Sequence, residues 1–97
     1  MTRSGYVYLM ASQPNGTIYL GVTSDIARRA YQHRFGLVEG FTKKHGCTRL
    51  VWFEQFDDIQ DARTRERQMK SWKRAWKLRL IEEANPAWRD LFDDLSG

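Results

Sequence analysis

The chain contains few of the residues that form crosslinks, kinks or membrane spans. Its 97 residues include one cysteine and two prolines, and its uncharged stretches are broken by glycine, asparagine and glutamine. The single Cys47 excludes an internal disulfide and a zinc site built from several cysteines. The lack of a long apolar run excludes a membrane-spanning helix. Thr2 and Arg3 after Met1 predict no signal peptide, so we expect a cytoplasmic protein.

The residues that are present favour one small folded domain. Hydrophobic residues make up 41% of the chain and aromatic residues 13%, which is more than a disordered chain contains. A chain of this length can bury one hydrophobic core. We therefore expect a single domain over residues 1–97.

Basic residues are concentrated in two parts of the chain, which has a net charge of +4. Residues 1–53 hold seven basic and two acidic residues, and residues 63–79 hold eight basic residues and one acidic residue, Glu66. By contrast, residues 82–94 hold five acidic residues and one basic residue. A basic surface with aromatic residues points to a phosphate-bearing partner, whereas a solvated cationic helix face would give the same composition.

Two β-rich runs at the start of the chain predict an antiparallel hairpin. Residues 6–10 and 17–22 flank the turn cluster Gln-Pro-Asn-Gly at 13–16. Since side chains alternate along a strand, Tyr8 shares a face with Tyr6 and Met10, and Tyr19 shares a face with Gly21. The two tyrosines Tyr8 and Tyr19 are then expected to point to the same side of the sheet.

The rest of the chain predicts helices around a third strand. Ser24 or Asp25 can cap a helix that ends near residue 35, a loop rich in lysine and glycine follows, and residues 49–56 form a strand. A helical pattern from about 58 to 84 has a break near 71–72 and ends before Pro86. Residues 88–95 form a short helix or a packed tail. The expected fold is α/β (α+β), a small three-stranded antiparallel sheet flanked by helices in the order β-β-α-β-α-α.

Glu66 is the acidic residue whose position is most informative. Counting 100° per residue places it about 40° from Ala62, and Met69, Trp76 and Leu80 also lie within about 40° of Ala62. Glu66 therefore borders the apolar stripe of its helix. It can be an ion-pair partner for a nearby lysine, or a carboxylate that holds a divalent cation against phosphate.

Four further polar residues are candidates for chemistry. Arg29 and His33 are four residues apart and share one face of the first predicted helix. Arg29 can bind phosphate and His33 can hydrogen-bond a hydroxyl or a phosphate, although both also suit an ordinary helix face. Tyr8 and Tyr19 are typical packing residues of strands, and a tyrosine becomes a base only where a cation lowers its pKa.

These residues, in this order, resemble the GIY-YIG nuclease superfamily, in particular a group of small, stand-alone bacterial single-domain members. The two motif halves correspond to residues 6–8, Tyr-Val-Tyr, and 19–21, Tyr-Leu-Gly. The first half departs from the family pattern because Tyr6 and Val7 replace glycine and isoleucine, and Gly5 lies one position early. The single-domain group is further suggested by residues 41–44, 49–52 and 85–91.

The resemblance implies a metal-dependent endonuclease. Glu66 would bind Mg²⁺ or Mn²⁺, which would hold the scissile phosphate and stabilise the leaving 3′ oxygen. Tyr8 would act as general base or position the water, Tyr19 and His33 would orient the nucleophile or phosphate, and Arg29 would stabilise the transition state. Asn85 is a further candidate for support, with helix capping as the alternative. All five catalytic candidates should then converge on one face of the sheet, around a cleft.

The expected substrate is DNA, in branched, damaged or single-stranded form, with RNA as a second candidate. This suggests a role in DNA repair or processing. A monomer and a homodimer are both compatible with the sequence. The competing hypothesis is a binding module that holds nucleic acid on its basic face without catalysis. The residues expected to follow the nucleic-acid backbone are Arg28, Arg34, Lys43, Lys44, Lys70 and Lys73.

Overall fold

A computed structural model describes residues 3–95, so residues 1–2 and 96–97 of the expected domain range lie outside it. The elements follow in the order β1 (Gly5–Ala11), β2 (Ile18–Thr23), α1 (Ile26–Arg34), α2 (Phe41–Lys44), β3 (Arg49–Phe56), α3 (Ile59–Lys70), α4 (Arg74–Ala84) and α5 (Phe92–Leu95). The sheet is antiparallel with strand order β2-β1-β3. The predicted mixed fold and three-stranded sheet are therefore confirmed. The two one-turn helices α2 and α5 complete the chain.

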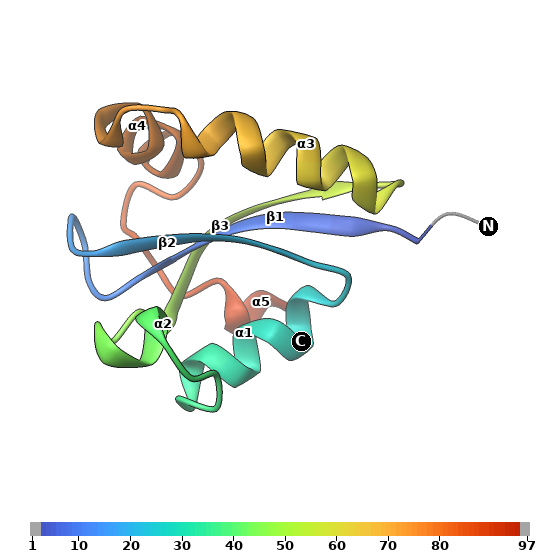
Figure 1. Ribbon diagram of the computed structural model, residues 1–97. Helices are drawn as coiled ribbons and strands as arrows, with labels where there is room; N and C mark the ends of the chain where they lie inside the picture. Colours follow the sequence, from blue (N-terminus) through green and yellow to red (C-terminus); the bar gives the residue numbers. More distant parts are fainter. Residues whose placement is uncertain (1–2, 96–97) are drawn as a thin grey trace.

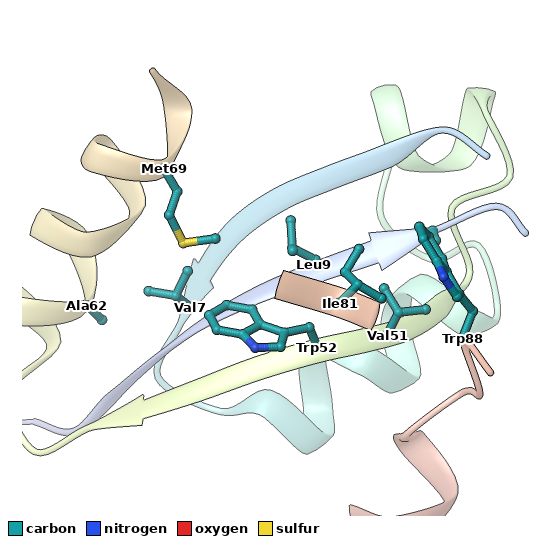
Figure 2. Packing of buried hydrophobic residues seen from close by; sticks show 9 residues of the cluster. Val7, Leu9, Val51, Trp52, Ala62, Met69, Ile81 and Trp88 are labelled. Carbon is teal, nitrogen blue, oxygen red and sulfur yellow. The ribbon is translucent and has the colours of Figure 1, made fainter. Parts of the chain in front are cut away.

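Helices cover both faces of the sheet (Figure 1). Helices α3 and α4 lie on one face, and α1, α2 and α5 lie on the other. The main core fills the α3 face, where Val7 and Leu9 of β1 meet Trp52 of β3, Met69 of α3 and Ile81 of α4 (Figure 2). Each of these five side chains is almost completely buried. Burial of this apolar surface holds the helices in place and positions everything attached to them.

The register of the hairpin determines which residues meet on the α1 face. Tyr8 pairs with Gly21, and Met10 pairs with Tyr19. Directly paired residues point to the same side of a sheet, so the two tyrosines share one face as predicted. Leu20 of β2 points to the opposite face and packs against the main core. Strand β2 is an edge strand, and its outer edge lies beside the helical layer that contains α3.

The opposite edge of the sheet is covered by the segment after α4. The side-chain amide nitrogen of Asn85 donates to the carbonyl oxygens of Val51 (3.1 Å) and Arg89 (2.8 Å), and its oxygen accepts from the Arg89 backbone N–H (3.1 Å). The Leu91 N–H donates to the Leu50 carbonyl at 2.7 Å. Asn85 thus holds the chain against β3, with β1 between it and β2. This geometry favours a structural role over support of the catalytic candidates.

The break expected near residues 71–72 is present, and it changes the position of Trp76. Helix α3 ends at Lys70, α4 begins at Arg74, and the Arg74 guanidinium donates to the carbonyls of Asn15 (3.1 Å) and Gly16 (2.6 Å). The 100° count along α3 therefore does not give the side-chain directions in α4, because the helix is interrupted between Lys70 and Arg74. Met69 is buried as expected, but the placement of Trp76 in that stripe is wrong, because its side chain is 50% exposed.

The segment expected to be a loop around Lys43 and Lys44 contains helix α2. The Lys44 N–H donates to the Gly40 carbonyl at 3.0 Å, and His45 donates to Phe41 at 3.0 Å. Thr42 in this turn is buried. The two lysines are therefore attached to an ordered turn that packs against the domain. Within residues 3–95, no helix has the length and apolar character needed to cross a bilayer.

Candidate functional site

Buried hydrogen bonds join β1, α1 and α2 on the α1 face. The Tyr8 hydroxyl oxygen lies 3.1 Å from Nε2 of His33, and Nδ1 of His33 lies 3.1 Å from Oγ1 of Thr42. Asp25 caps the start of α1 by accepting from the Arg28 N–H, which fixes the helix that carries His33. The imidazole is therefore held at both nitrogens, and its orientation relative to Tyr8 is set.

The protonation states of Tyr8 and His33 follow from their burial. Burial lowers the pKa of His33 to about 4, and the positive charge of Arg29 acts in the same direction. Burial also raises the pKa of Tyr8, with a further contribution from Tyr19, whereas Arg29 opposes the rise. At neutral pH, His33 is a neutral imidazole and Tyr8 a protonated phenol. Since burial outweighs Arg29, the free protein does not favour a Tyr8 phenolate.

Tyr19 connects this pair to the surface. Its ring centroid lies 6.3 Å from that of Tyr8, 5.8 Å from that of His33 and 6.1 Å from that of Phe41. Phe41 belongs to α2 and is about half exposed. Tyr19 is itself half-buried, so its phenol can meet a ligand while its ring packs against the buried pair.

Gly21 is the residue that allows Tyr8 to lie across β2. A Cβ atom built on Gly21 would lie 2.5 Å from the Tyr8 hydroxyl oxygen and 2.6 Å from Cζ. These distances are shorter than van der Waals contact, so a larger residue would displace the ring. Gly5 has a different role, because its Cβ would meet Ile59 of α3 at distances of 2.7 to 2.9 Å. Gly5 therefore allows α3 to approach β1.

A groove of about 480 Å³ runs between the outer edge of β2 and helix α3. Tyr19 and Gly21 line it from the strand, and Glu66 lines it from the helix. The groove is basic, since its remaining charged lining residues are Arg63, Arg67 and Lys70. Gly21 also faces the Tyr8 hydroxyl, so this residue of the edge strand borders both the groove and the buried Tyr8–His33 pair.

Glu66 is positioned for both roles that the sequence left open. Its Oε1 lies 3.0 Å from Nζ of Lys70, which confirms the ion pair as one of them. The Glu66 side chain is only 14% exposed and that of Lys70 is 67% exposed. The placement of Glu66 beside the apolar stripe is thus confirmed, and its carboxylate faces the groove. A cation that binds to the Glu66 carboxylate would displace the ammonium group of Lys70, which can be solvated because its side chain is largely exposed.

Four of the five catalytic candidates lie on the α1 face, and Glu66 does not. Tyr8, Tyr19 and His33 are in direct contact there, and Arg29 is close enough for its charge to act on Tyr8 and His33. Glu66 comes from α3 on the opposite face, and of the other four candidates only Tyr19 is among the described residues that line the groove with it. The expectation that all five candidates converge on a single face is therefore wrong, because Glu66 lies on the other side of the edge strand β2.

The basic residues expected to follow nucleic acid are distributed unevenly. Lys70 lines the groove, and Arg28 lines a second hollow of about 220 Å³ together with Arg29 and Thr23. Lys43 is paired with Glu39 at 3.0 Å. Lys44 and Lys73 are exposed on α2 and at the start of α4, where they can meet a partner.

Arg34 is a basic candidate with several contacts inside the protein. It forms ion pairs with Asp93 at 3.0 Å and with Asp90 at 3.7 Å. Its guanidinium also lies 5.3 Å from the centre of the Phe92 ring. These contacts join α1 to the acidic C-terminal segment, so Arg34 stabilises the packing of α5.

The residues of the groove suit a divalent cation that needs few protein ligands. Between residues 3 and 95, no three or more His, Cys, Asp or Glu side chains gather where they could hold one metal ion. Mg²⁺ often binds through one or two carboxylates and completes its coordination with water and phosphate oxygens. Glu66 beside a basic, open groove fits that requirement.

Thr42 and Phe41 are site residues that reasoning from the sequence did not assign. Both depend on α2, whose docking against α1 brings Thr42 to the His33 ring and Phe41 to Tyr19. No spacing in the sequence indicates these contacts. The contact of Gly21 with Tyr8 could have been found, because a hairpin that pairs residues 8 and 21 places one directly across from the other.

Acidification should destabilise the protein through His33. The pKa of His33 is about 4 in the folded protein and has its ordinary value of 6.5 in the unfolded chain, so the unfolded chain takes up the proton first. The contribution of neutral His33 to stability is complete above pH 6.5, the pKa in the unfolded chain. It is lost as the pH falls toward about 4, the pKa in the folded protein. Going from about pH 7 to about pH 5 should cost about 2 kcal/mol.

Urea unfolding at several pH values measures this effect, with His33→Gln as the comparison. The wild type should lose more unfolding free energy than the variant over this range, because the variant lacks the titrating group. Equal losses in the two proteins would show that His33 does not carry the pH dependence.

The domain combines a basic groove that contains a carboxylate and a tyrosine with a buried tyrosine–histidine pair near an arginine, which are the groups expected of a nuclease domain. Comparison with known proteins supports the assignment to the nuclease class. Residues 4–79 match the family model described as the GIY-YIG catalytic domain. The chain therefore belongs to the GIY-YIG family.

Known relatives are small proteins of similar length. The chain is 35% identical to a UPF0213 protein of Staphylococcus saprophyticus over 78 residues, which are 80% of this chain and 94% of the relative. It is 36% identical to a UPF0213 protein of Haloquadratum walsbyi over 78 residues, 80% and 86% of the two chains. The solution structure of a UPF0213 protein from Bacillus halodurans superposes with a TM-score of 0.55 at 28% identity, covering 90% of this chain and 92% of that one.

Proposed function

We propose that the protein is a divalent-metal-dependent endonuclease that hydrolyses phosphodiester bonds of DNA in the cytoplasm, in the repair or processing of structured or single-stranded DNA. The observation that carries the proposal is the groove along β2. It combines a carboxylate, Glu66, with three basic side chains, and one of its lining residues, Gly21, lies against the Tyr8 hydroxyl of the Tyr8–His33 pair.

The groove supplies the charges that a phosphodiester requires. Arg63, Arg67 and Lys70 attract and hold the DNA backbone, since phosphate contacts supply most of the affinity and little of the sequence preference. Glu66 would hold Mg²⁺ or Mn²⁺. Such a cation, when bound, neutralises charge on the scissile phosphate and on the leaving 3′ oxygen. As Lys70 loses its carboxylate partner, it becomes available to a phosphate oxygen.

Tyr8 and His33 handle the proton of the attacking water. Tyr8 is a protonated phenol at neutral pH, so it takes the proton of the water as it passes its own to Nε2 of His33, 3.1 Å away. The resulting imidazolium donates from Nδ1 to the Thr42 hydroxyl. A bound phosphate is negatively charged, and it opposes the effect of burial and Arg29 on the pKa of His33.

Arg29 and Tyr19 stabilise the reacting phosphate. The charge of Arg29 acts on both Tyr8 and His33, so it also acts on negative charge that develops beside them. Tyr19 lines the groove and is half-buried, so its phenol can donate a hydrogen bond to a phosphate oxygen. Both contributions are positioning and charge neutralisation, which dominate the catalysis of phosphate chemistry.

A second candidate function is a nucleic-acid-binding module without catalysis. The ion pair between Glu66 and Lys70 favours it, because the carboxylate already has a partner in the free protein. The raised pKa of Tyr8 favours it as well, because the phenol is a poor base. This alternative predicts binding that weakens with salt and does not depend on divalent metal.

A cleavage panel separates the two functions. Duplex, single-stranded and branched DNA and single-stranded RNA are incubated with the protein in Mn²⁺, in Mg²⁺ or in EDTA. We expect nicking of at least one DNA substrate in Mn²⁺, and loss of this nicking in EDTA. Salt-sensitive binding without cleavage of any substrate would overturn the nuclease proposal and favour the binding module.

A further inference from the structure

A hollow on α4 lies outside the site described above. It has a volume of about 240 Å³ and is lined by Trp72, Trp76, Arg79, Leu80 and Glu83. A hollow of this size has room for one planar base. The Trp76 side chain is 50% exposed, although tryptophan normally buries most of its large apolar surface. Because Trp76 also borders a hollow, its exposed ring can offer a face to a ligand.

The two tryptophans are held in a fixed arrangement. The guanidinium of Arg65 lies 5.1 Å from the centre of the Trp72 ring, and Nε of Arg65 lies 3.3 Å from Oε1 of Glu54 on β3. Trp72 also packs against the main core. Trp76 meets Trp72 edge to face, with ring centroids 6.3 Å apart and an angle of 72° between the planes. The contact with Trp72 therefore holds the exposed Trp76 ring in place.

The chain that leads to the hollow is basic, and the hollow itself is lined by one basic and one acidic residue, Arg79 and Glu83. Residues 63–79 contain eight basic residues and one acidic residue, and that residue, Glu66, is already paired with Lys70. Glu83 is the one acidic side chain among the described residues that line the hollow. A basic surface that carries an exposed aromatic ring is typical of proteins that bind single-stranded nucleic acid, in which bases stack on the ring and phosphates meet the cations.

The hollow and the groove along β2 are lined by residues that are close together in the chain. Lys70, the last residue of α3, lines the groove, and Trp72, two residues further on, lines the hollow. We propose that Trp76 is a stacking platform for an unpaired base of single-stranded DNA, whose backbone continues from the groove past Lys70. This inference rests on the proposed function and narrows its substrate to DNA with a single-stranded segment beside the cleaved bond.

Binding without cleavage tests the proposal. A fluorescent oligothymidylate and a duplex of the same length are titrated in EDTA with the wild type, Trp76→Ala and Trp76→Phe, and anisotropy is recorded. Trp76→Ala should weaken binding of the single strand by about tenfold or more and binding of the duplex by less than about twofold. Trp76→Phe should recover most of the lost affinity, because phenylalanine also offers an aromatic face.

Phe35→Ala is the matched control. Phe35 is also an exposed aromatic residue, but it lies just after α1 on the other face of the sheet. Its loss should leave binding of the single strand unchanged. Equal effects of the Trp76 and Phe35 variants, or equal effects of Trp76→Ala on single strand and duplex, would overturn the proposal. A change in oligomeric state of Trp76→Ala, measured by light scattering, with unchanged DNA binding would also overturn it.

The binding experiment and the cleavage panel can fail separately, so their outcomes distinguish the two proposals. Binding is measured without metal, whereas the cleavage panel measures turnover with Mn²⁺. If the protein cleaves DNA and Trp76→Ala binds the single strand normally, only the stacking platform is wrong. If Trp76→Ala loses binding of the single strand and the wild type cleaves nothing, the platform is supported and the endonuclease proposal fails.

Discussion

Replacing Glu66 by glutamine should lower the rate of Mn²⁺-dependent DNA cleavage by about 10³-fold or more, which corresponds to about 4 kcal/mol of lost transition-state stabilisation. Glutamine keeps the size and the hydrogen-bonding oxygen of the side chain but removes its negative charge. Glu66 is the acidic residue among those that line the groove, so no described neighbour there can replace its charge. Single-turnover cleavage, with enzyme in excess over a labelled substrate, measures the loss directly.

Lys70→Met is the control that isolates the carboxylate. Both variants break the Glu66–Lys70 ion pair, but only Glu66→Gln removes the group that would hold a cation. The pair is largely exposed on the lysine side, so its loss should cost less than about 1 kcal/mol of stability. Lys70→Met should lose several-fold in DNA affinity and saturate at a lower Mn²⁺ concentration. A similar decrease of the cleavage rate in Glu66→Gln and Lys70→Met would mean that cleavage requires the ion pair rather than the carboxylate alone.

Local patterns were sufficient to predict the elements that carry the site. Alternation along two short strands placed Tyr8 and Tyr19 on one face, and the observed register agrees. Helix α1 is capped by Asp25, one of the two residues expected as its cap. Periodicity also placed Glu66 beside the apolar stripe of its helix, where it is 14% exposed. Each of these inferences depends on residues that are near one another in the chain.

Features that depend on contacts between distant segments could not be predicted in this way. The docking of α2 brings Thr42 to His33, and only tertiary packing determines that contact. The helical count failed at Trp76 because the chain changes direction after Lys70, so the periodicity of α3 does not extend into α4. The raised pKa of Tyr8 is also a tertiary property, since it arises mainly from burial.

Replacing Gly21 by alanine should reduce DNA cleavage by about 10²-fold, because the added methyl group displaces the Tyr8 ring from its position beside His33. The new Cβ would lie 2.5 Å from the Tyr8 hydroxyl oxygen, and the ring is buried and cannot move outward freely. Overpacking of this kind should also lower the free energy of unfolding by about 1–3 kcal/mol. Cleavage is therefore compared at a temperature at which urea titration shows each variant to be fully folded.

Gly5→Ala separates loss of stability from loss of site geometry. Its Cβ would meet Ile59 of α3 on the other side of the sheet, so it overpacks the domain to a similar degree without touching Tyr8. Gly5→Ala should lose stability and, while folded, cleave at close to the rate of the wild type. DNA affinity should stay within a few-fold of the wild type in both variants, since the basic residues of the groove are unchanged. If folded Gly21→Ala cleaves as fast as Gly5→Ala, the position of the Tyr8 hydroxyl does not limit the reaction.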